Sequence, residues 1–161
     1  MSRRDAGITL VEVAAAVTLL GIVVALIVPS IARSSRFQKV LACEANLRLL
    51  HGAQTNYYKP GMKERGQEYW TRLADQTPPL VSADALHCPF VTGAGTRRCH
   101  YLGPVAEPFK LEAKDPLGCD LEDNHSDDGK EGGNVLLKSG EVVTDRTGLW
   151  NSAARQGKCR P

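Results

Sequence analysis

The sequence lacks the features that mark several classes of protein. Its 20 Lys and Arg nearly balance its 18 Asp and Glu, and no long basic cluster stands out. The electrostatic footprint of a nucleic-acid-binding protein is therefore absent. It also contains no Gly-x-Ser-x-Gly motif, no phosphate-binding loop and no His-Glu-x-x-His motif. These absences favour a structural or binding role over catalysis, although a Cys–His pair formed only by the fold would leave no such signature.

Aromatic residues are also few, at 6%, whereas the chain has 15 Gly and 9 Pro, most of them after residue 59. This composition is typical of a loop-rich domain with short strands. The 161 residues are enough for one modest domain once the N-terminal segment is set aside.

One long segment near the N-terminus contains a single charged residue. From Ile8 to Val28 the residues are apolar apart from Thr9, Thr18 and Gly21, and Glu12 is the only charged one. As a helix, this segment spans roughly 30 Å, the thickness of the hydrocarbon core of a membrane.

Three interpretations of this segment compete. A secretory signal peptide would be cleaved near Ser30–Ala32 and leave a chain that starts at Arg33, but Glu12 would have no purpose in it. A plain membrane anchor tolerates Glu12 near the interface, because a charge costs less there than the roughly 2.5–3.5 kcal/mol of the bilayer centre.

The third interpretation accounts for every feature together. The stretch Gly-Ile-Thr-Leu-Val-Glu at 7–12, after the basic residues Arg3 and Arg4, resembles the processing site of type IV prepilins and type II secretion pseudopilins. The resemblance implies cleavage between Gly7 and Ile8 and N-methylation of Ile8, where Phe is commonest in that family. Glu12 then becomes the fifth residue of the mature chain, and Pro29 takes the place of a helix-kinking proline.

The resemblance implies an assembly role for Glu12. After cleavage, Ile8 carries a positive amine one helical turn away, and in a filament Glu12 could also meet the amine of a neighbouring subunit. A carboxylate in a low-dielectric place is favoured by such a partner and costly without one. The implied partners are other pseudopilin subunits, a prepilin peptidase and an inner-membrane assembly platform. A monomeric anchored binding domain is the alternative.

The expected fold is the α+β pilin architecture: a long N-terminal helix packed on a small antiparallel sheet. We expect a leader at 1–7, a membrane-spanning and filament-core helix at 8–29, an amphipathic continuation at 30–58 and a globular head at 59–161. Pro29 should kink the helix without ending it. Its buried face should consist of residues spaced three, four and seven apart: Phe37, Val40, Cys43, Leu47, Leu50 and Tyr57.

Within the head, we expect a short helix at Glu68–Asp75 with Trp70 and Leu73 facing inward. Strands are predicted at Cys99–Val105 and Phe109–Ala113. A hairpin is predicted from the β-rich runs Asn134–Lys138 and Glu141–Asp145, which Ser139-Gly140 separates as a two-residue turn.

The five cysteines, Cys43, Cys88, Cys99, Cys119 and Cys159, favour an oxidising compartment beyond the membrane. We therefore place the amino terminus in the cytoplasm and the head outside a bacterial inner membrane, although Arg33, Arg36 and Lys39 follow the apolar segment. Two bonds among five cysteines can be chosen in 15 ways. The stretches around Cys43 and Cys88 resemble parts of one pseudopilin subfamily, so this pair comes first; Cys88 with Cys99 is the local alternative.

The most polar stretch is the acidic loop at 120–131, which also contains His125. With the run that follows it, this loop resembles the C-terminal signature of the same subfamily, but it is longer, and Ser139 replaces the usual Asp before Gly140. Clustered carboxylates suit Ca²⁺, and the predicted ligands are Asp120, Asp123, Asp127 and Asp128. A solvated acidic loop is the simpler explanation. A zinc site of His87, Cys88, Cys99 and His100 is disfavoured, because its adjacent ligands lack the usual spacing.

Overall fold

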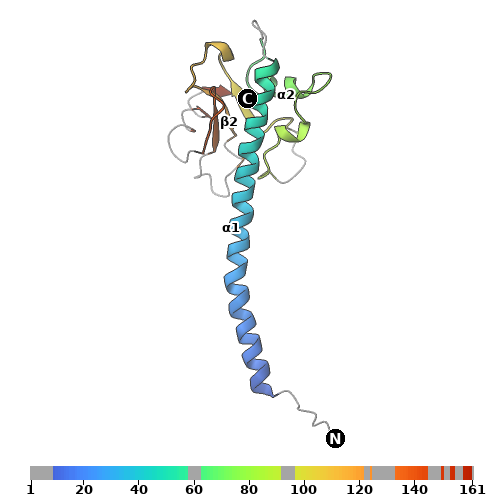
Figure 1. The fold of residues 1–161 in the computed structure, drawn as a ribbon, viewed down its shortest axis with the longest axis vertical. Coiled ribbons are helices and arrows are strands. Elements are labelled where there is room, and N and C mark those ends of the chain that lie inside the picture. The colour runs from blue at the N-terminus through green and yellow to red at the C-terminus, as the bar shows by residue number, and fades with distance from the viewer. Residues whose placement is uncertain are drawn as a thin grey trace. The chain divides into compact units, whose positions relative to one another are not determined.

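The computed structural model describes residues 9–57, 63–91, 97–121, 124, 133–144, 150, 153–154 and 158–160, without the side chains of residues 32 and 36. The chain divides into two compact units, Met1–Gln38 and Lys39–Pro161. Figure 1 shows a long helix and a small sheet with short helices and loops, which is the predicted α+β pilin-like layout.

Helix α1 runs from Leu10 to Tyr57 and closely matches the predicted helix. Pro29 lies inside it, so the helix continues through this residue, as predicted. Thr9 precedes the first helical residue and Glu12 lies in the first turn, at the end where a negative side chain is favoured by the helix dipole.

The second half of α1 buries one face in the core of the second unit. Cys43, Leu47 and Leu50 are completely buried, and Ala53 is nearly so. Their spacing of three or four residues places them on one side of a helix, as predicted. The prediction was wrong for Phe37, which is 64% exposed. It also missed Gln54, a buried polar residue next to Ala53 on the same helix.

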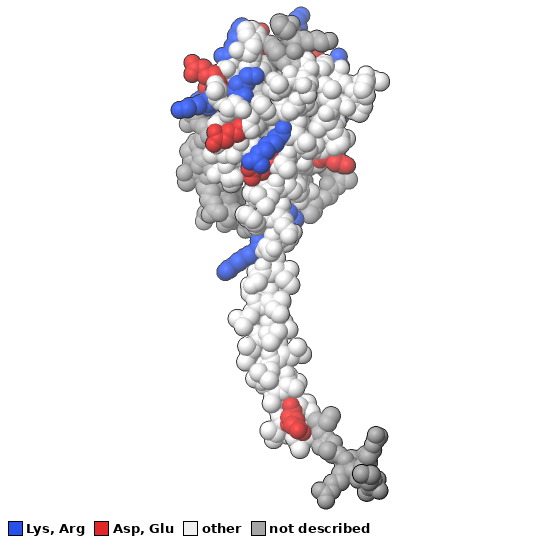
Figure 2. Space-filling model, in the orientation of Figure 1, with Lys and Arg blue, Asp and Glu red and all other residues white. Residues whose placement is uncertain are grey.

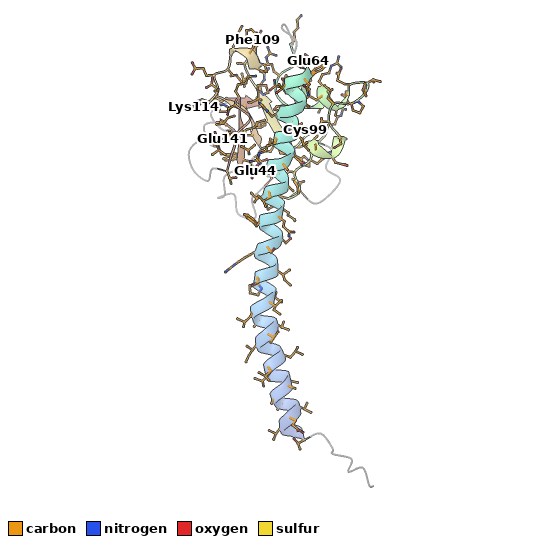
Figure 3. The ribbon with its side chains drawn as sticks, viewed as in Figure 1. Glu44, Glu64, Cys99, Phe109, Lys114 and Glu141 are labelled. Carbon is orange, nitrogen blue, oxygen red and sulfur yellow. The ribbon has the colours of Figure 1, made fainter. Side chains whose placement is uncertain are left out.

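The head also contains short helices. Helix α2 spans Gln67–Ala74, close to the prediction, and buries Trp70 and Leu73 completely. The 3₁₀ helices are η1, Ala83–Leu86, and η2, Pro108–Lys110. The strand predicted at Phe109–Ala113 was wrong. Pro108 has no N–H for a ladder and suits the first helical position, so the chain turns there and leaves Phe109 exposed at the periphery (Figure 3).

The sheet has the strand order β4-β3-β2-β1-β5, and every neighbouring pair is antiparallel. Its strands are β1 (Tyr101–Pro104), β2 (Pro116–Asp120), β3 (Asn134–Leu137), β4 (Val142–Thr144) and β5 (Cys159–Arg160). The sequence predicted β1, β3 and β4 but neither β2 nor β5. β2 starts with Pro and contains Gly118, both unfavourable in strands, and β5 has only two residues.

The β3–β4 hairpin differs in detail from the prediction. Leu137 donates its N–H to the Glu141 carbonyl at 2.8 Å, and Gly140 donates its N–H to the Leu137 carbonyl at 2.9 Å. The loop therefore contains three residues, from Lys138 to Gly140, rather than two. Gly140 has φ of 89°, the left-handed conformation that a three-residue hairpin loop requires at this position.

One close backbone contact joins β1 to the start of α2. Gly66 donates its N–H to the Pro104 carbonyl at 3.0 Å, and the indole N–H of Trp70 donates to the Leu102 carbonyl at 3.0 Å. Gly103, between these two acceptors, lies so near that a Cβ on it would be 1.9 Å from the Gly66 carbonyl oxygen. The residue at 103 must therefore be glycine for α2 and β1 to pack in this way.

Candidate functional site

The first candidate site is the apolar surface of α1 in the first unit. It is the one helix, among the residues that the structure describes, long and apolar enough to cross a membrane, and none of its most apolar 18-residue window is buried. Figure 2 shows this segment almost free of charged side chains. The exposed large apolar residues include Leu10, Val11, Val17, Leu19, Leu20, Ile22, Leu26, Ile27, Val28 and Ile31. Exposure on this scale requires a cover of lipid or of other helices.

Glu12 closes the N-terminal end of this helix. Its Oε2 accepts hydrogen bonds from the Thr9 N–H at 2.8 Å and from the Thr9 hydroxyl at 2.9 Å, and the Glu12 N–H donates to Thr9 Oγ1 at 3.3 Å. This reciprocal arrangement is a capping box. In one chain the carboxylate is therefore already held in place by the first turn.

Thr9, which caps this helix together with Glu12, was not among the predicted site residues. The signal was present, because Thr-x-x-Glu directly before an apolar run is the pattern of a capping box. Glu12 was predicted to pair with an amine, whereas the structure gives it a hydrogen-bonding neighbour at the start of its own helix. The cleavage position, between Gly7 and Ile8, lies outside the described residues.

The side-chain hydroxyls of Thr18 and Ser30 are hydrogen-bonded within the helix. Thr18 Oγ1 donates to the Ala14 carbonyl at 2.8 Å, and Ser30 Oγ donates to the Leu26 carbonyl at 3.2 Å. Such i−4 bonds let hydroxyl groups enter an apolar environment without an unmade hydrogen bond. The segment is thus compatible with a membrane along its length, and Glu12 is its single ionisable group.

The second candidate site is a buried cluster in the head, formed by Cys43 of α1, Cys88 and Asp120 at the end of β2. Their ligand atoms all lie within 4.8 Å of one another. Cys43 Sγ donates to Asp120 Oδ1 at 3.0 Å, and Asp120 Oδ2 accepts the N–H of Asn134 at 2.7 Å. The Tyr101 hydroxyl lies 3.5 Å from Cys43 Sγ. The cluster and its neighbours thus tie α1 to β1, β2 and β3 and to the segment after η1.

The electrostatics of this cluster disfavour nucleophilic chemistry. The hydrogen bond with Cys88, burial and the Asp120 carboxylate raise the pKa of Cys43 far above its usual range. Burial raises the pKa of Cys99 to about 12. A thiol reacts as its thiolate, so both cysteines are held in their unreactive, protonated form at neutral pH.

Asp120 lies elsewhere than predicted. It was assigned to the acidic loop as a calcium ligand, but it is completely buried in β2, and its two carboxylate oxygens accept hydrogen bonds from Cys43 and Asn134. The other three predicted ligands, Asp123, Asp127 and Asp128, lie outside the described residues. Calcium binding therefore stays a prediction.

The four residues of the disfavoured zinc site take separate roles. The rings of His87 and His100 meet edge to face, with centroids 4.8 Å apart. His100 Nδ1 accepts the N–H of Cys88 at 3.2 Å, and Cys99 Sγ contacts the backbone of Tyr101. Within the described part of the chain, the potential metal ligands that converge are instead Cys43, Cys88 and Asp120.

We expect His100 to make the stability of the head depend on pH. Burial, followed by the neighbouring His87, lowers the pKa of His100 below its ordinary value of about 6.5. The folded state then binds fewer protons than the unfolded state, so this contribution is complete above about pH 6.5 and is lost as the pH falls below it. We expect the free energy of unfolding to decrease between about pH 7 and pH 5 in denaturant titrations of the full chain.

His100→Asn is the matched variant for this measurement, because its side-chain oxygen can still accept the Cys88 N–H but does not titrate. We expect a flatter pH profile for this variant than for the original chain. Equal slopes for the two proteins over this range would show that His100 is not the responsible group.

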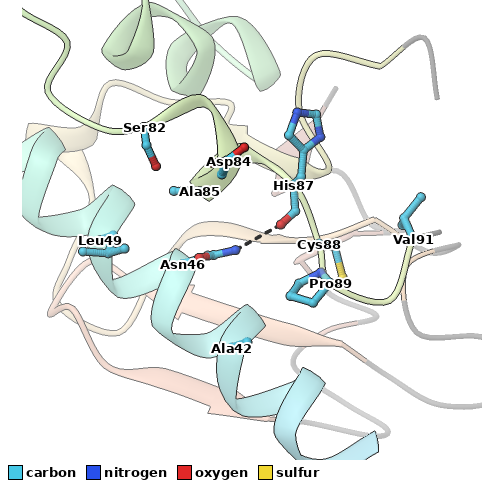
Figure 4. A pocket seen from close by; sticks show the side chains of 10 residues that line it. All are labelled: Ala42, Asn46, Leu49, Ser82, Asp84, Ala85, His87, Cys88, Pro89 and Val91. Carbon is cyan, nitrogen blue, oxygen red and sulfur yellow. Dashed lines mark hydrogen bonds between the residues drawn. The ribbon is translucent and has the colours of Figure 1, made fainter. Parts of the chain in front are cut away.

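An open groove of about 470 Å³ runs beside the second half of α1 (Figure 4). Its lining includes Ala42, Leu49, Ala85, Pro89 and Val91. The side-chain amide of Asn46 crosses it to donate to the His87 carbonyl at 3.0 Å. A mainly apolar groove of this size suits side chains or a small ligand from another molecule.

Residues 2–28 match the family model of the prokaryotic N-terminal methylation motif. This match covers the N-terminal segment and supports a type IV pilin-like protein. The matched range contains Gly7, Ile8 and Glu12, the residues on which the predicted processing rests. No curated protein and no solved structure matches the chain significantly.

The match and the structure together support a processed, prepilin-like subunit of pilus or pseudopilus type. They point to a structural subunit rather than an enzyme. The exposed apolar helix and the motif are consistent with a single-pass protein anchored in a membrane. The motif also implies processing by a prepilin peptidase and assembly with other pilin-like subunits.

Proposed function

We propose that the protein is a pseudopilin of a type II secretion pseudopilus or of a related type IV pilus-like filament. A prepilin peptidase cleaves it between Gly7 and Ile8, Ile8 is N-methylated, and the mature chain assembles through α1. The observation that carries the proposal is the position of Glu12. It is the one charged residue of the apolar segment, and it is the fifth residue after the cleavage position, in the first turn of the helix.

During assembly, the apolar surface of α1 would exchange contacts with lipid for contacts with other helices. In the membrane, the exposed residues of α1 contact lipid; in a filament, they contact the helices of neighbours. Because lipid chains and apolar side chains are similarly nonpolar, this exchange changes the free energy of the apolar surface little. Specificity must then come from the polar group, and the pairing of Glu12 with a neighbour's N-terminal amine would fix the register between subunits.

The topology we propose has the N-terminus in the cytoplasm and the head outside the inner membrane. The support is the position of the basic residues Arg3 and Arg4 before the segment and the buried cysteines of the head. Arg33 follows the segment, but long domains cross the membrane largely regardless of such charges. An inner-membrane platform would then extract the subunits into the filament.

A second candidate is a membrane-anchored binding domain that does not polymerise. The open groove beside α1 favours it, because a groove of about 470 Å³ is large enough for a small ligand. In this case the apolar segment serves only as an anchor, and Glu12 is a helix cap and nothing more. The two functions differ in whether assembly requires the charge of Glu12.

The experiment that tests processing is N-terminal sequencing and intact mass measurement of the protein from membranes that contain a prepilin peptidase. We expect the mature chain to start at Ile8 and to carry one added methyl group. In an otherwise identical host without the peptidase, we expect the N-terminal leader to remain.

Two results would contradict the proposal. A chain that starts at Arg33 would identify a cleaved signal peptide and an exported domain without an anchor. A chain that retains residues 1–7 in the presence of the peptidase would leave a plain anchor.

A further inference from the structure

We propose that the head, once oxidised, contains two disulfide bonds, Cys43–Cys88 and Cys119–Cys159, and that Cys99 keeps its thiol. The structure holds the five cysteines as buried thiols without a disulfide among them, and all five lie in the described part of the chain. Their placement selects one of the fifteen arrangements that the sequence leaves open. The inference concerns the head and goes beyond its assembly into a filament.

The first pair joins the helix to the head. Cys43 lies on the buried face of α1 and Cys88 lies just after η1, and both belong to the same apolar cluster. Their sulfur atoms are within 4.8 Å of each other. A disulfide brings the sulfurs to about 2.05 Å, which a rotation of the two side chains and a small backbone adjustment can supply.

The second pair joins the C-terminal strand to the sheet. Cys119 of β2 lies opposite Leu102 of β1, and Cys159 of β5 lies opposite Pro104 of the same strand. Because Leu102 and Pro104 are two residues apart, both cysteines project from the same face of the sheet.

Contacts between β2 and β5 bring the two cysteines close together on this face. β2 and β5 lie against each other although β1 pairs with both, and Cys119 and Cys159 belong to one apolar cluster with Trp150. The neighbouring Cys159 thiol, together with burial, raises the pKa of Cys119. The strand β5 has only two residues, so a covalent link would secure an element that two residue pairs hold weakly.

Cys99 is the cysteine left over. It belongs to the cluster that contains Cys43 and Cys88, but its sulfur contacts the backbone N–H and carbonyl of Tyr101 and does not join the converging group. The local alternative, Cys88 with Cys99, would have to compete with a Cys43 sulfur that is already beside Cys88.

The chemistry is thiol–disulfide exchange with a disulfide oxidant, such as oxidised glutathione or a protein disulfide. A cysteine thiolate attacks the oxidant to form a mixed disulfide, and the second cysteine then displaces the reduced oxidant. Each bond removes two protons and two electrons from the protein, and the oxidant receives them as two thiols. Because the four cysteines are at most 2% exposed in the folded head, the exchange must take place before the head closes.

The Cys43–Cys88 disulfide would remove one buried hydrogen bond. Cys43 loses the hydrogen that it donates to Asp120 Oδ1, while the Asn134 N–H still donates to Oδ2. The bond therefore fixes α1 to the head covalently and leaves the buried carboxylate with its backbone partner.

The test is a peptide map of the full chain purified from membranes of a host with an oxidising compartment. Free thiols are blocked under acidic, denaturing conditions, and the protein is digested with trypsin without reduction. Cleavage after Lys and Arg places every cysteine on its own peptide, namely 40–48, 73–97, 99–110, 115–130 and 159–161. We expect 40–48 linked to 73–97, 115–130 linked to 159–161, and 99–110 carrying the blocking group.

Variants sharpen the result. Cys43→Ser should leave 73–97 fully blocked and the other link intact, whereas the matched control Cys99→Ser should change neither link. The map of the unaltered chain tests the pairing even where a variant does not fold.

Three outcomes would overturn the proposal. The first is a link between 73–97 and 99–110. The second is any link between a peptide that carries Cys43, Cys88 or Cys99 and a peptide that carries Cys119 or Cys159. The third is five blocked thiols, with or without a metal ion in the native mass, because Cys43, Cys88 and Asp120 would then remain a thiol cluster or a metal site. None of these results depends on filament assembly.

Discussion

Glu12→Gln is expected to abolish filament assembly while the chain still inserts into the membrane and is still cleaved after Gly7. Glutamine can accept the same hydrogen bonds from Thr9, so the helix start is preserved. Only the negative charge is lost. Removing one partner of a buried ion pair costs about 3–5 kcal/mol, because the other charge is left uncompensated. Each subunit contact should therefore weaken more than a hundredfold.

The measurement is the yield of sheared filaments in a host that expresses the assembly platform, with membrane-bound and processed subunit quantified in the same cells. Thr9→Ala is the matched control, because it removes the capping partner but keeps the carboxylate. We expect it to cost about 1 kcal/mol at the helix end and to leave assembly largely intact. Loss of filaments with Thr9→Ala and normal filaments with Glu12→Gln would assign Glu12 to capping alone.

Gly103→Ala is expected to destabilise the head by about 3–5 kcal/mol, at the upper end of what single substitutions do. The added Cβ would lie 1.9 Å from the Gly66 carbonyl oxygen, a backbone atom that cannot rotate away. β1 would have to move off α2, and the hydrogen bonds from Gly66 to Pro104 and from Trp70 to Leu102 would break. Because the free energy of unfolding of a domain is only roughly 5–15 kcal/mol, this substitution would remove a large part of it.

Denaturant titration of the full chain in detergent measures this effect. Trp70 and Trp150, the two tryptophans of the chain, are both buried in the head, so their fluorescence reports its unfolding. The control is Gly52→Ala. Gly52 lies on an exposed part of α1 with nothing within 4 Å of a new Cβ, so alanine should stabilise the helix by up to about 1 kcal/mol. An unchanged midpoint for Gly103→Ala would show that β1 and α2 do not pack as closely as described.

The parts of the fold that the sequence predicted well are those with a long or strict periodic pattern. Helix α1 has an apolar run and then a buried face repeated every three or four residues, so Cys43, Leu47 and Leu50 could be assigned to the core without a structure. Helix α2 and strands β1, β3 and β4 followed from local propensity in the same way. Phe37 fitted the helical spacing equally well, but spacing alone does not say where along a helix its packing partner begins.

The parts that the sequence did not predict depend on contacts between distant residues. β2 contains residues that disfavour strands and exists because β1 and β3 pair with it on both sides. Asp120 stands first in an acidic run, which suggested a solvated loop. Its inward position requires Cys43, 77 residues away in the sequence, to meet it in the core. The pairing of cysteines is hidden for the same reason.

The backbone hydrogen bonds of α1 determine how the helix responds to tension. Such tension would arise if the subunit were pulled out of a bilayer by its head. Tension along a helix is carried by the backbone bonds between successive turns. Pro29 has no N–H to donate to the carbonyl of Ala25, and Gly21, two turns earlier, has the weakest helix propensity after proline. Under an axial load, the helix should therefore lengthen first between residues 21 and 29, and in the proposed filament this stretch would act as an elastic element.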